Sequence, residues 1–163
     1  MNNKSYKTNE TNNCREASEN SATILDELFS DISEGITTEE IDNYCLERIK
    51  KFGGVPAPLF YRGFPKSTCT SPNRVICHGI PSNGRKLLEG DILNVDITTI
   101  INGWHGDSSR IYKIGKVSVK SNNLCEVTHQ CIIESIKEIK VGDSISKIGK
   151  KSDEIANNNY FSV

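Results

Sequence analysis

Two aspartates in a predicted β-hairpin, Asp96 and Asp107, form the pattern most typical of chemistry in this sequence. Between them lies Asn102-Gly103, a strong signal for a two-residue hairpin turn. With that turn, Asp96 lies opposite Ser109 and Asp107 lies opposite Thr98, so both carboxylates share one face of the hairpin. Their backbones are then diagonal neighbours, roughly 7–8 Å apart. Because a divalent cation would turn the repulsion between them into attraction, the hairpin predicts a metal site.

The competing interpretation makes both aspartates ordinary charges on a solvated sheet face. The residues around Asp96 are apolar, and Asp is disfavoured inside strands, which favours a functional role. Carboxylate oxygens suit Mn²⁺, Mg²⁺, Fe²⁺, Co²⁺ or a dinuclear site better than they suit a thiolate zinc site. Thr98 shares the face and is a candidate second-layer hydrogen-bond donor to a ligating carboxylate or bound water.

Composition excludes several classes of partner. The 163 residues include 20 basic and 21 acidic side chains, without the basic footprint of a nucleic-acid-binding protein. No apolar run approaches the roughly 20 residues of a membrane helix, and the polar start lacks a signal core. We therefore expect a cytoplasmic protein with no nucleic-acid or membrane partner. The six cysteines form no Cys-x-x-Cys pair, so most are expected to be small, reduced, buried residues.

Hydrophobic periodicity predicts the elements that position the hairpin. Residues 1–13 are polar and predict a flexible leader, followed by a single domain over residues 14–163. Four helices are expected: Arg15 to Gly35, a helix capped by Thr37 with Glu40 and ending at Gly53, Ser121–Ile139, and a helix capped by Asp143 or Ser144.

The expected strands are Ser67–Ser71, Arg74–His78, the two hairpin strands 92–100 and 104–114, and the start of a strand at 160–163. Grouped helices and strands, rather than strict alternation, favour an α+β fold with an antiparallel sheet. His78 precedes the rigid Gly79-Ile80-Pro81 segment, and such a position at a strand end is typical of binding residues, although a structural role is also open.

Four segments, in this order, resemble the signature of type I methionine aminopeptidases. They are Phe64–Ser71, Cys77–Pro81, Gly90–Thr98 and Gly103–Arg110. The resemblance extends from about Ala17 to Val163. It implies the pita-bread fold, here the first pseudo-repeat of antiparallel sheet covered by helices, and a site with two divalent metal ions (Co, Mn, Fe or Zn).

The resemblance also implies a function: removal of the initiator methionine from nascent polypeptides, near the ribosome, by a monomer. Asp96 would chelate one metal, Asp107 would bridge both, and metal-bridging hydroxide would attack the first peptide bond. His78 would be catalytic and hydrogen-bond the substrate. Tyr61, Phe64 and Cys69 would line an apolar pocket that accepts an unbranched thioether.

The resemblance implies five metal ligands, of which this sequence contains two. The remaining His and two Glu would follow a stretch similar to Phe161–Val163. His105 shares the face of Asp107 and is a weak candidate for a substitute. We therefore expect a truncated product or partial sequence that binds metal weakly. Two alternatives stay open: a non-catalytic fragment or interaction module of the same family, and a related proline-specific peptidase with the same fold.

Overall fold

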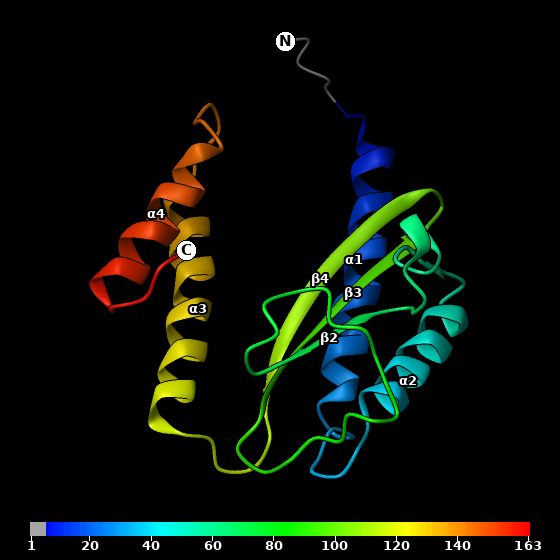
Figure 1. Cartoon of the computed structure of the whole chain (residues 1–163). Helices are drawn as coiled ribbons and strands as arrows, with labels where there is room; N and C mark the ends of the chain where they lie inside the picture. The colour runs from blue at the N-terminus through cyan, green and yellow to red at the C-terminus, as the bar shows by residue number, and fades with distance from the viewer. Residues whose placement is uncertain (1–5) are drawn as a thin grey trace. The chain divides into compact units, whose positions relative to one another are not determined.

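The computed structural model describes residues 6–163 and shows an α+β arrangement of helices around an antiparallel sheet (Figure 1). Residue contacts divide the chain into two compact units, one ending at Lys116 and the other spanning Val117–Val163. The first unit contains α1 (Thr8–Leu28), α2 (Thr38–Lys51), β1 (Val55–Pro56), the 3₁₀ turn η1 (Tyr61–Gly63), β2 (Cys69–Pro72), β3 (Ile92–Ile101) and β4 (Trp104–Lys113). The second unit contains α3 (Val119–Glu138) and α4 (Ser146–Asn158).

The hairpin of β3 and β4 forms as predicted. Its turn residues Asn102 and Gly103 both have positive φ, 51° and 77°, as a type I′ turn requires. The register places Asp96 opposite Ser109 and Thr98 opposite Asp107, which confirms the expected pairing. On its other edge, β3 pairs antiparallel with both β1 and β2.

The two faces of the hairpin differ completely in burial. Along β3, alternate side chains are buried, and Leu93, Val95 and Ile97 join the core with residues of α1 and α2. In Figure 1, α1 passes behind the hairpin of β3 and β4. The intervening residues of β3, including Asp96 and Thr98, lie on the opposite face and remain partly accessible.

Helix α1 lies directly against the backbone of β4. A Cβ at Gly106 would come within 2.1 Å of the Ala17 carbonyl group, so only glycine fits there. Ser21 is fully buried, and its hydroxyl donates to the Gly106 carbonyl at 2.7 Å and contacts the Thr99 hydroxyl at 3.0 Å. Buried Tyr112 donates to the Leu25 carbonyl at 2.6 Å, so helix and hairpin are joined at two levels.

The predicted start of α1 is wrong, whereas the predicted start of α2 is confirmed. α1 begins at Thr8 rather than Arg15, because Glu10 accepts from the Lys7 amide and starts the helix within the expected leader. Residues 8–13 are therefore helical, while residues 1–5 lie outside the described part. α2 has the predicted capping box, with Thr37 and Glu40 exchanging hydrogen bonds of 3.1 and 2.8 Å.

The predicted strand Arg74–His78 is wrong. The chain leaves the sheet after Pro72 through a turn in which Asn73 has positive φ and the Val75 amide donates to the Pro72 carbonyl. The strand expected at Ser67–Ser71 exists but starts at Cys69, because the carboxylate of Asp42 takes the amide hydrogens of the two residues before it.

In the second unit, α3 matches its prediction within two residues at its start, whereas α4 begins later than expected. Asp143 does not cap α4, because its carboxylate accepts from the Lys140 amide and the Lys147 ammonium. No strand forms at 160–163. Instead, Tyr160 has positive φ and the Phe161 amide donates back to the Ala156 carbonyl, which closes the helix end.

All six cysteines are free, and Cys45, Cys69 and Cys125 are buried, so the expectation that most are buried holds for half of them. Among residues 6–163, no helix is both long enough and apolar enough to cross a membrane.

Replacing Gly106 by Ala is expected to lower the free energy of unfolding by about 3 kcal/mol, because the new methyl group would overlap the backbone of α1. Thermal unfolding measures the effect. Gly149→Ala is the matched control, since a Cβ there meets nothing within 4 Å and a helix interior gains roughly 0.5–1 kcal/mol from the change. Equal melting temperatures for the two variants would contradict the close approach.

Candidate metal centre

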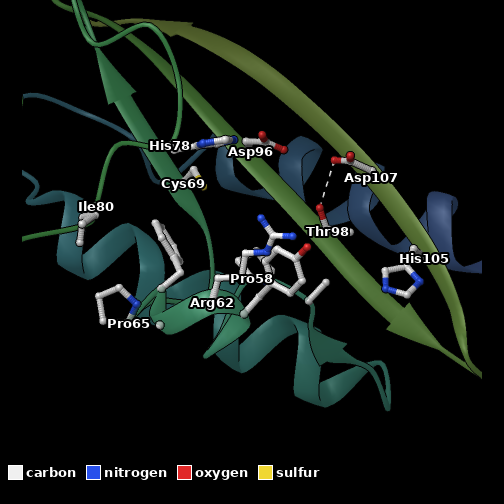
Figure 2. Close-up of a pocket in the computed structure, with 14 residues that line it drawn as sticks. Pro58, Arg62, Pro65, Cys69, His78, Ile80, Asp96, Thr98, His105 and Asp107 are labelled. Carbon is white, nitrogen blue, oxygen red and sulfur yellow. Dashed lines mark hydrogen bonds between the residues drawn. The ribbon is translucent and has the colours of Figure 1, made fainter.

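A cavity of about 870 Å³ lies on the face of the hairpin away from α1 and α2 (Figure 2). Its lining includes every residue that the sequence singled out for a site: Tyr61, Phe64, Cys69, His78, Asp96, Thr98 and Asp107. Six of these residues belong to the four segments that carry the family resemblance, and Tyr61 lies three residues before the first segment. The fold brings them around one space, which the rest of the lining completes: Ala57, Pro58, Arg62, Gly63, Pro65, Ile80 and His105.

Asp96 and Asp107 are diagonal neighbours on one face of the hairpin, because Asp96 lies opposite Ser109 and Asp107 lies opposite Thr98, as the sequence predicted. Thr98 donates from its hydroxyl to Oδ1 of Asp107 at 3.1 Å, the dashed line in Figure 2. Burial raises the pKa of Asp96 above its ordinary value, and the neighbouring charge of Asp107 raises it further, while His78 opposes the rise. Without a cation, this pair is therefore electrostatically unfavourable.

The residues present fit a hard divalent ion only in part. Two carboxylates with mutual repulsion are suitable oxygen ligands, and Thr98 already orients one of them. Within residues 6–163, however, no three His, Cys, Asp or Glu side chains gather in a group that could hold a metal. His105 lines the cavity without completing such a group. Among residues 6–163, this cavity thus offers two carboxylates as candidate metal ligands.

Cys69 forms part of the wall beside the carboxylates. It lies opposite Asp96 in the β2–β3 register and is 8% exposed. Burial, followed by the charge of Asp96, raises the pKa of its thiol to about 11. The thiol therefore keeps its proton at neutral pH, which suits an apolar wall and not a nucleophile or a thiolate ligand.

The opposite wall is a tight loop with unusual backbone geometry. Phe60 and Arg62 adopt positive φ of 67° and 49°, and Gly63 follows at 84°. The Phe60 amide and the Phe64 carbonyl close this loop at 2.8 Å, and the Arg62 guanidinium lies 5.5 Å from the Tyr61 ring centroid. Strained non-glycine residues are typical of binding sites, where the surrounding structure holds them in place. Tyr61 itself is 64% exposed, so this wall is open to solvent.

Helix α2 fixes the segment that leads into Cys69. Asp42 is 3% exposed and accepts from the amides of Ser67 and Thr68 and from the Thr68 hydroxyl, at 2.8–3.0 Å. Burial raises the pKa of Asp42, and these hydrogen bonds oppose the rise. Glu39 of the same helix forms an ion pair with Lys66. The pocket segment is thus tied to the helix at three consecutive residues.

The loop that carries His78 is held by β2. His78 has φ of 54°, in the left-handed region. The residue after it, Gly79, is held through both its amide and its carbonyl group. The Gly79 amide donates to Oγ of Ser71 at 3.2 Å, and the Gly79 carbonyl accepts from the Thr70 amide at 2.9 Å. A Cβ at Gly79 would lie 2.0 Å from the Thr70 carbonyl oxygen, so glycine is required beside this strand.

Sequence reasoning missed the two residues that hold the walls, Asp42 and Ser71. Asp42 had a usable signal, because it falls on the apolar side of its helix next to Ile41 and Cys45. Ser71 had none, since a serine in a strand gives no indication of its hydrogen-bond partner. Ile80 was also missed as a lining residue.

Known proteins resemble this chain in sequence and in fold. Residues 12–163 match the model of metallopeptidase family M24. The chain is 39% identical over 149 residues to methionine aminopeptidase of Rickettsia prowazekii and 44% identical to methionine aminopeptidase A of Synechocystis. Both alignments cover 91% of this chain, which spans 57% and 59% of the length of those relatives.

A crystal structure of the Rickettsia prowazekii methionine aminopeptidase superposes with a TM-score of 0.94 at 36% identity, covering 98% of this chain and 64% of that one. The family resemblance and the expected pita-bread α+β fold are therefore confirmed for the part that this chain covers.

Replacing Asp96 by Asn is expected to stabilise the metal-free protein at pH 7 by about 1 kcal/mol, because it removes a half-buried charge next to Asp107. Folding raises the pKa of Asp96 above its ordinary value of 3.8. Asp96 therefore lowers the free energy of unfolding only as the pH rises above 3.8, and its full effect is reached once the pH exceeds the raised pKa. Melting temperatures in EDTA at pH 3.5 and 7 test this, with exposed Asp153→Asn as control. An equal gain at both pH values would contradict it.

Ser71→Ala should loosen the His78 loop, because the Gly79 amide loses its acceptor. A hydrogen bond worth about 1 kcal/mol predicts roughly fivefold faster hydrogen exchange at that amide. Amide exchange measured by NMR reports it, and Ser30→Ala at an exposed position provides the comparison. Unchanged exchange at Gly79 would show that the loop is held by other contacts.

Proposed function

Because the chain belongs to metallopeptidase family M24, we propose that its cavity is the methionine-binding part of a metal-dependent aminopeptidase site. One observation supports this most strongly: a single cavity holds the two carboxylates, His78 and the apolar wall of Tyr61, Phe64 and Cys69. The relatives named methionine aminopeptidase are 39–44% identical over most of this chain. The proposed reaction removes an N-terminal methionine.

Each residue has a proposed role. Asp96 and Asp107 would hold the divalent ions, Asp96 as a ligand of one ion and Asp107 as a ligand shared by both, and Thr98 would keep the Asp107 carboxylate oriented. The bound ions, of Co, Mn, Fe or Zn, would supply Lewis-acid polarisation of the scissile carbonyl and charge stabilisation. His78 reaches the same space from its strained loop, where its imidazole hydrogen-bonds the substrate. The hydrogen bonds of Gly79 to β2 fix the backbone from which this ring extends.

The substrate side chain lies between Cys69, in the wall beside the carboxylates, and the aromatic residues Tyr61 and Phe64 of the opposite wall. Aromatic rings and a neutral thiol favour an unbranched apolar thioether such as methionine. An open wall at Tyr61 leaves room for the peptide that follows. The proposed substrates are the N-termini of nascent polypeptides, met by a monomer in the cytoplasm near the ribosome. The proposed boundary puts residues 14–163 in the catalytic domain.

A non-catalytic role is the second candidate. Two carboxylates leave a divalent ion largely hydrated, and no third ligand joins them within residues 6–163. A protein with this portion alone would bind metal weakly and act as an interaction module. The third candidate, a proline-specific peptidase, is favoured by no particular residue in the described lining of the cavity.

Titration with Mn²⁺, followed by the EPR signal of the free ion, tests the carboxylate pair. We expect weak binding that Asp107→Ala reduces about tenfold, because that change removes one of two ligands. Asp153→Asn, with the loss of an exposed carboxylate in α4, should leave binding unchanged. Equal binding by all three proteins would contradict the proposed centre.

Peptide assays separate the three functions. With Mn²⁺ or Co²⁺, the purified chain should release methionine from Met-Ala-Ser slowly or not at all. Met-Ala should nevertheless perturb the NMR signals of Phe64 and Cys69, whereas Ala-Pro should not. Rapid release that Asp107→Ala abolishes would overturn the expectation of low activity and support the enzyme. Absence of any perturbation by Met-Ala would favour the interaction module.

A further inference from the structure

Arg62 is the one lysine or arginine in the described lining of the cavity that also holds Asp96 and Asp107. In Figure 2 its side chain extends from the loop of residues 60–64 into the space that the two carboxylates border. The residue is exposed, so a ligand in the cavity can reach it. The roles proposed above for the carboxylates, the imidazole and the apolar wall leave this positive charge without a function.

The backbone of the loop presents Arg62 in one direction. Its φ of 49° and ψ of 33° lie in the left-handed region, which is unfavourable for a residue with a side chain unless the surroundings hold it there. The hydrogen bond from the Phe60 amide to the Phe64 carbonyl, at 2.8 Å, closes the loop around it. The starting point of the Arg62 side chain is therefore set before any substrate binds.

The guanidinium of Arg62 is positioned by an aromatic ring and not by an acid. Its central carbon lies 5.5 Å from the Tyr61 ring centroid, within the range of a cation–π contact. Among residues 6–163, no carboxylate pairs with this guanidinium and no side-chain hydrogen bond engages it. A guanidinium carries five N–H donors, so this one can still bind an acceptor on a ligand.

The direction of the substrate chain follows from the alternation of side chains in an extended peptide. Side chains of its first and third residues point to the same side, roughly 7 Å apart along the chain. This step rests on the proposed function, in which the first side chain lies against Tyr61 and Phe64. The third side chain of an extended substrate then faces the same wall, where Arg62 follows Tyr61 in the loop.

We propose that Arg62 is a specificity-determining residue that favours an acidic side chain at the third residue of the substrate. A planar guanidinium matches the two oxygens of a carboxylate, which explains the choice of acid. A lysine at the third residue would meet a like charge and be disfavoured. The second side chain points away from this wall, so Arg62 does not discriminate there.

Tetrapeptides that differ only in the third residue test this role. The peptides Met-Ala-Glu-Ser, Met-Ala-Gln-Ser and Met-Ala-Lys-Ser carry C-terminal amides, because a free terminal carboxylate would itself pair with Arg62. Each is titrated without metal while the NMR signals of Phe64 and Cys69 report binding. We expect the Glu peptide to bind about threefold to fivefold more tightly than the Gln peptide, as an exposed ion pair allows, and the Lys peptide to bind most weakly.

Variants of the protein separate charge recognition from a structural role of the loop. Arg62→Glu should reverse the order of the Glu and Lys peptides, whereas Arg62→Lys, which retains the charge, should preserve it. Arg15→Glu makes the same charge reversal at an exposed position in α1 and should leave the order unchanged. The comparison of peptides on the unaltered chain does not depend on how these variants fold.

Two kinds of failure are distinguishable. Equal binding of the Glu, Gln and Lys peptides would overturn the role of Arg62 while the proposed methionine site stands. A preference for Met-Glu-Ala-Ser over Met-Gln-Ala-Ser, without one at the third residue, would overturn it as well. If no peptide perturbs Phe64 or Cys69, the proposed function fails and this inference fails with it.

Discussion

The register between β3 and β4 is the constraint on which the rest of the first unit depends. It places Asp96 and Asp107 on one face while Leu93, Val95 and Ile97 fill the core beneath α1 and α2. A slip of one residue would exchange the two sets, with carboxylates in the core and aliphatic side chains in the cavity. The turn at Asn102-Gly103 defines this register locally, and the contact of α1 with Gly106 defines it from the other side.

Packing on the face of the sheet that α1 and α2 cover offsets unfavourable interactions on the cavity face. On the cavity side, two carboxylates repel each other and Phe60, Arg62 and His78 occupy left-handed backbone conformations. Each of these features is unfavourable by itself. On the other face, close packing, the buried Ser21 hydroxyl and the Tyr112 hydrogen bond offset such costs. A site can retain its strain when the opposite side of the same sheet is well packed.

Sequence reasoning was most successful where local rules dominate. An Asn-Gly turn and alternation along two strands were enough to predict the carboxylate pair, and a capping box was enough to locate α2. It failed where a distant group decides the local structure. The segment Arg74–His78 has a strand-like composition but leaves the sheet through a turn after Pro72, and Asp42 delays the start of β2 by taking its first amides.

Because side chains alternate along β3, substitutions at even-numbered and odd-numbered residues affect opposite faces of the sheet. Odd positions from 93 to 101 are buried, and even positions from 92 to 100 are partly accessible. Of the even positions, Asp96 and Thr98 line the cavity, so a substitution there alters the cavity without touching the core, whereas a substitution at an odd position alters the core. Selection for a new ligand and selection for stability can therefore act on the same ten residues almost independently. One strand thus contains one set of residues that faces the cavity side and another set that packs in the core.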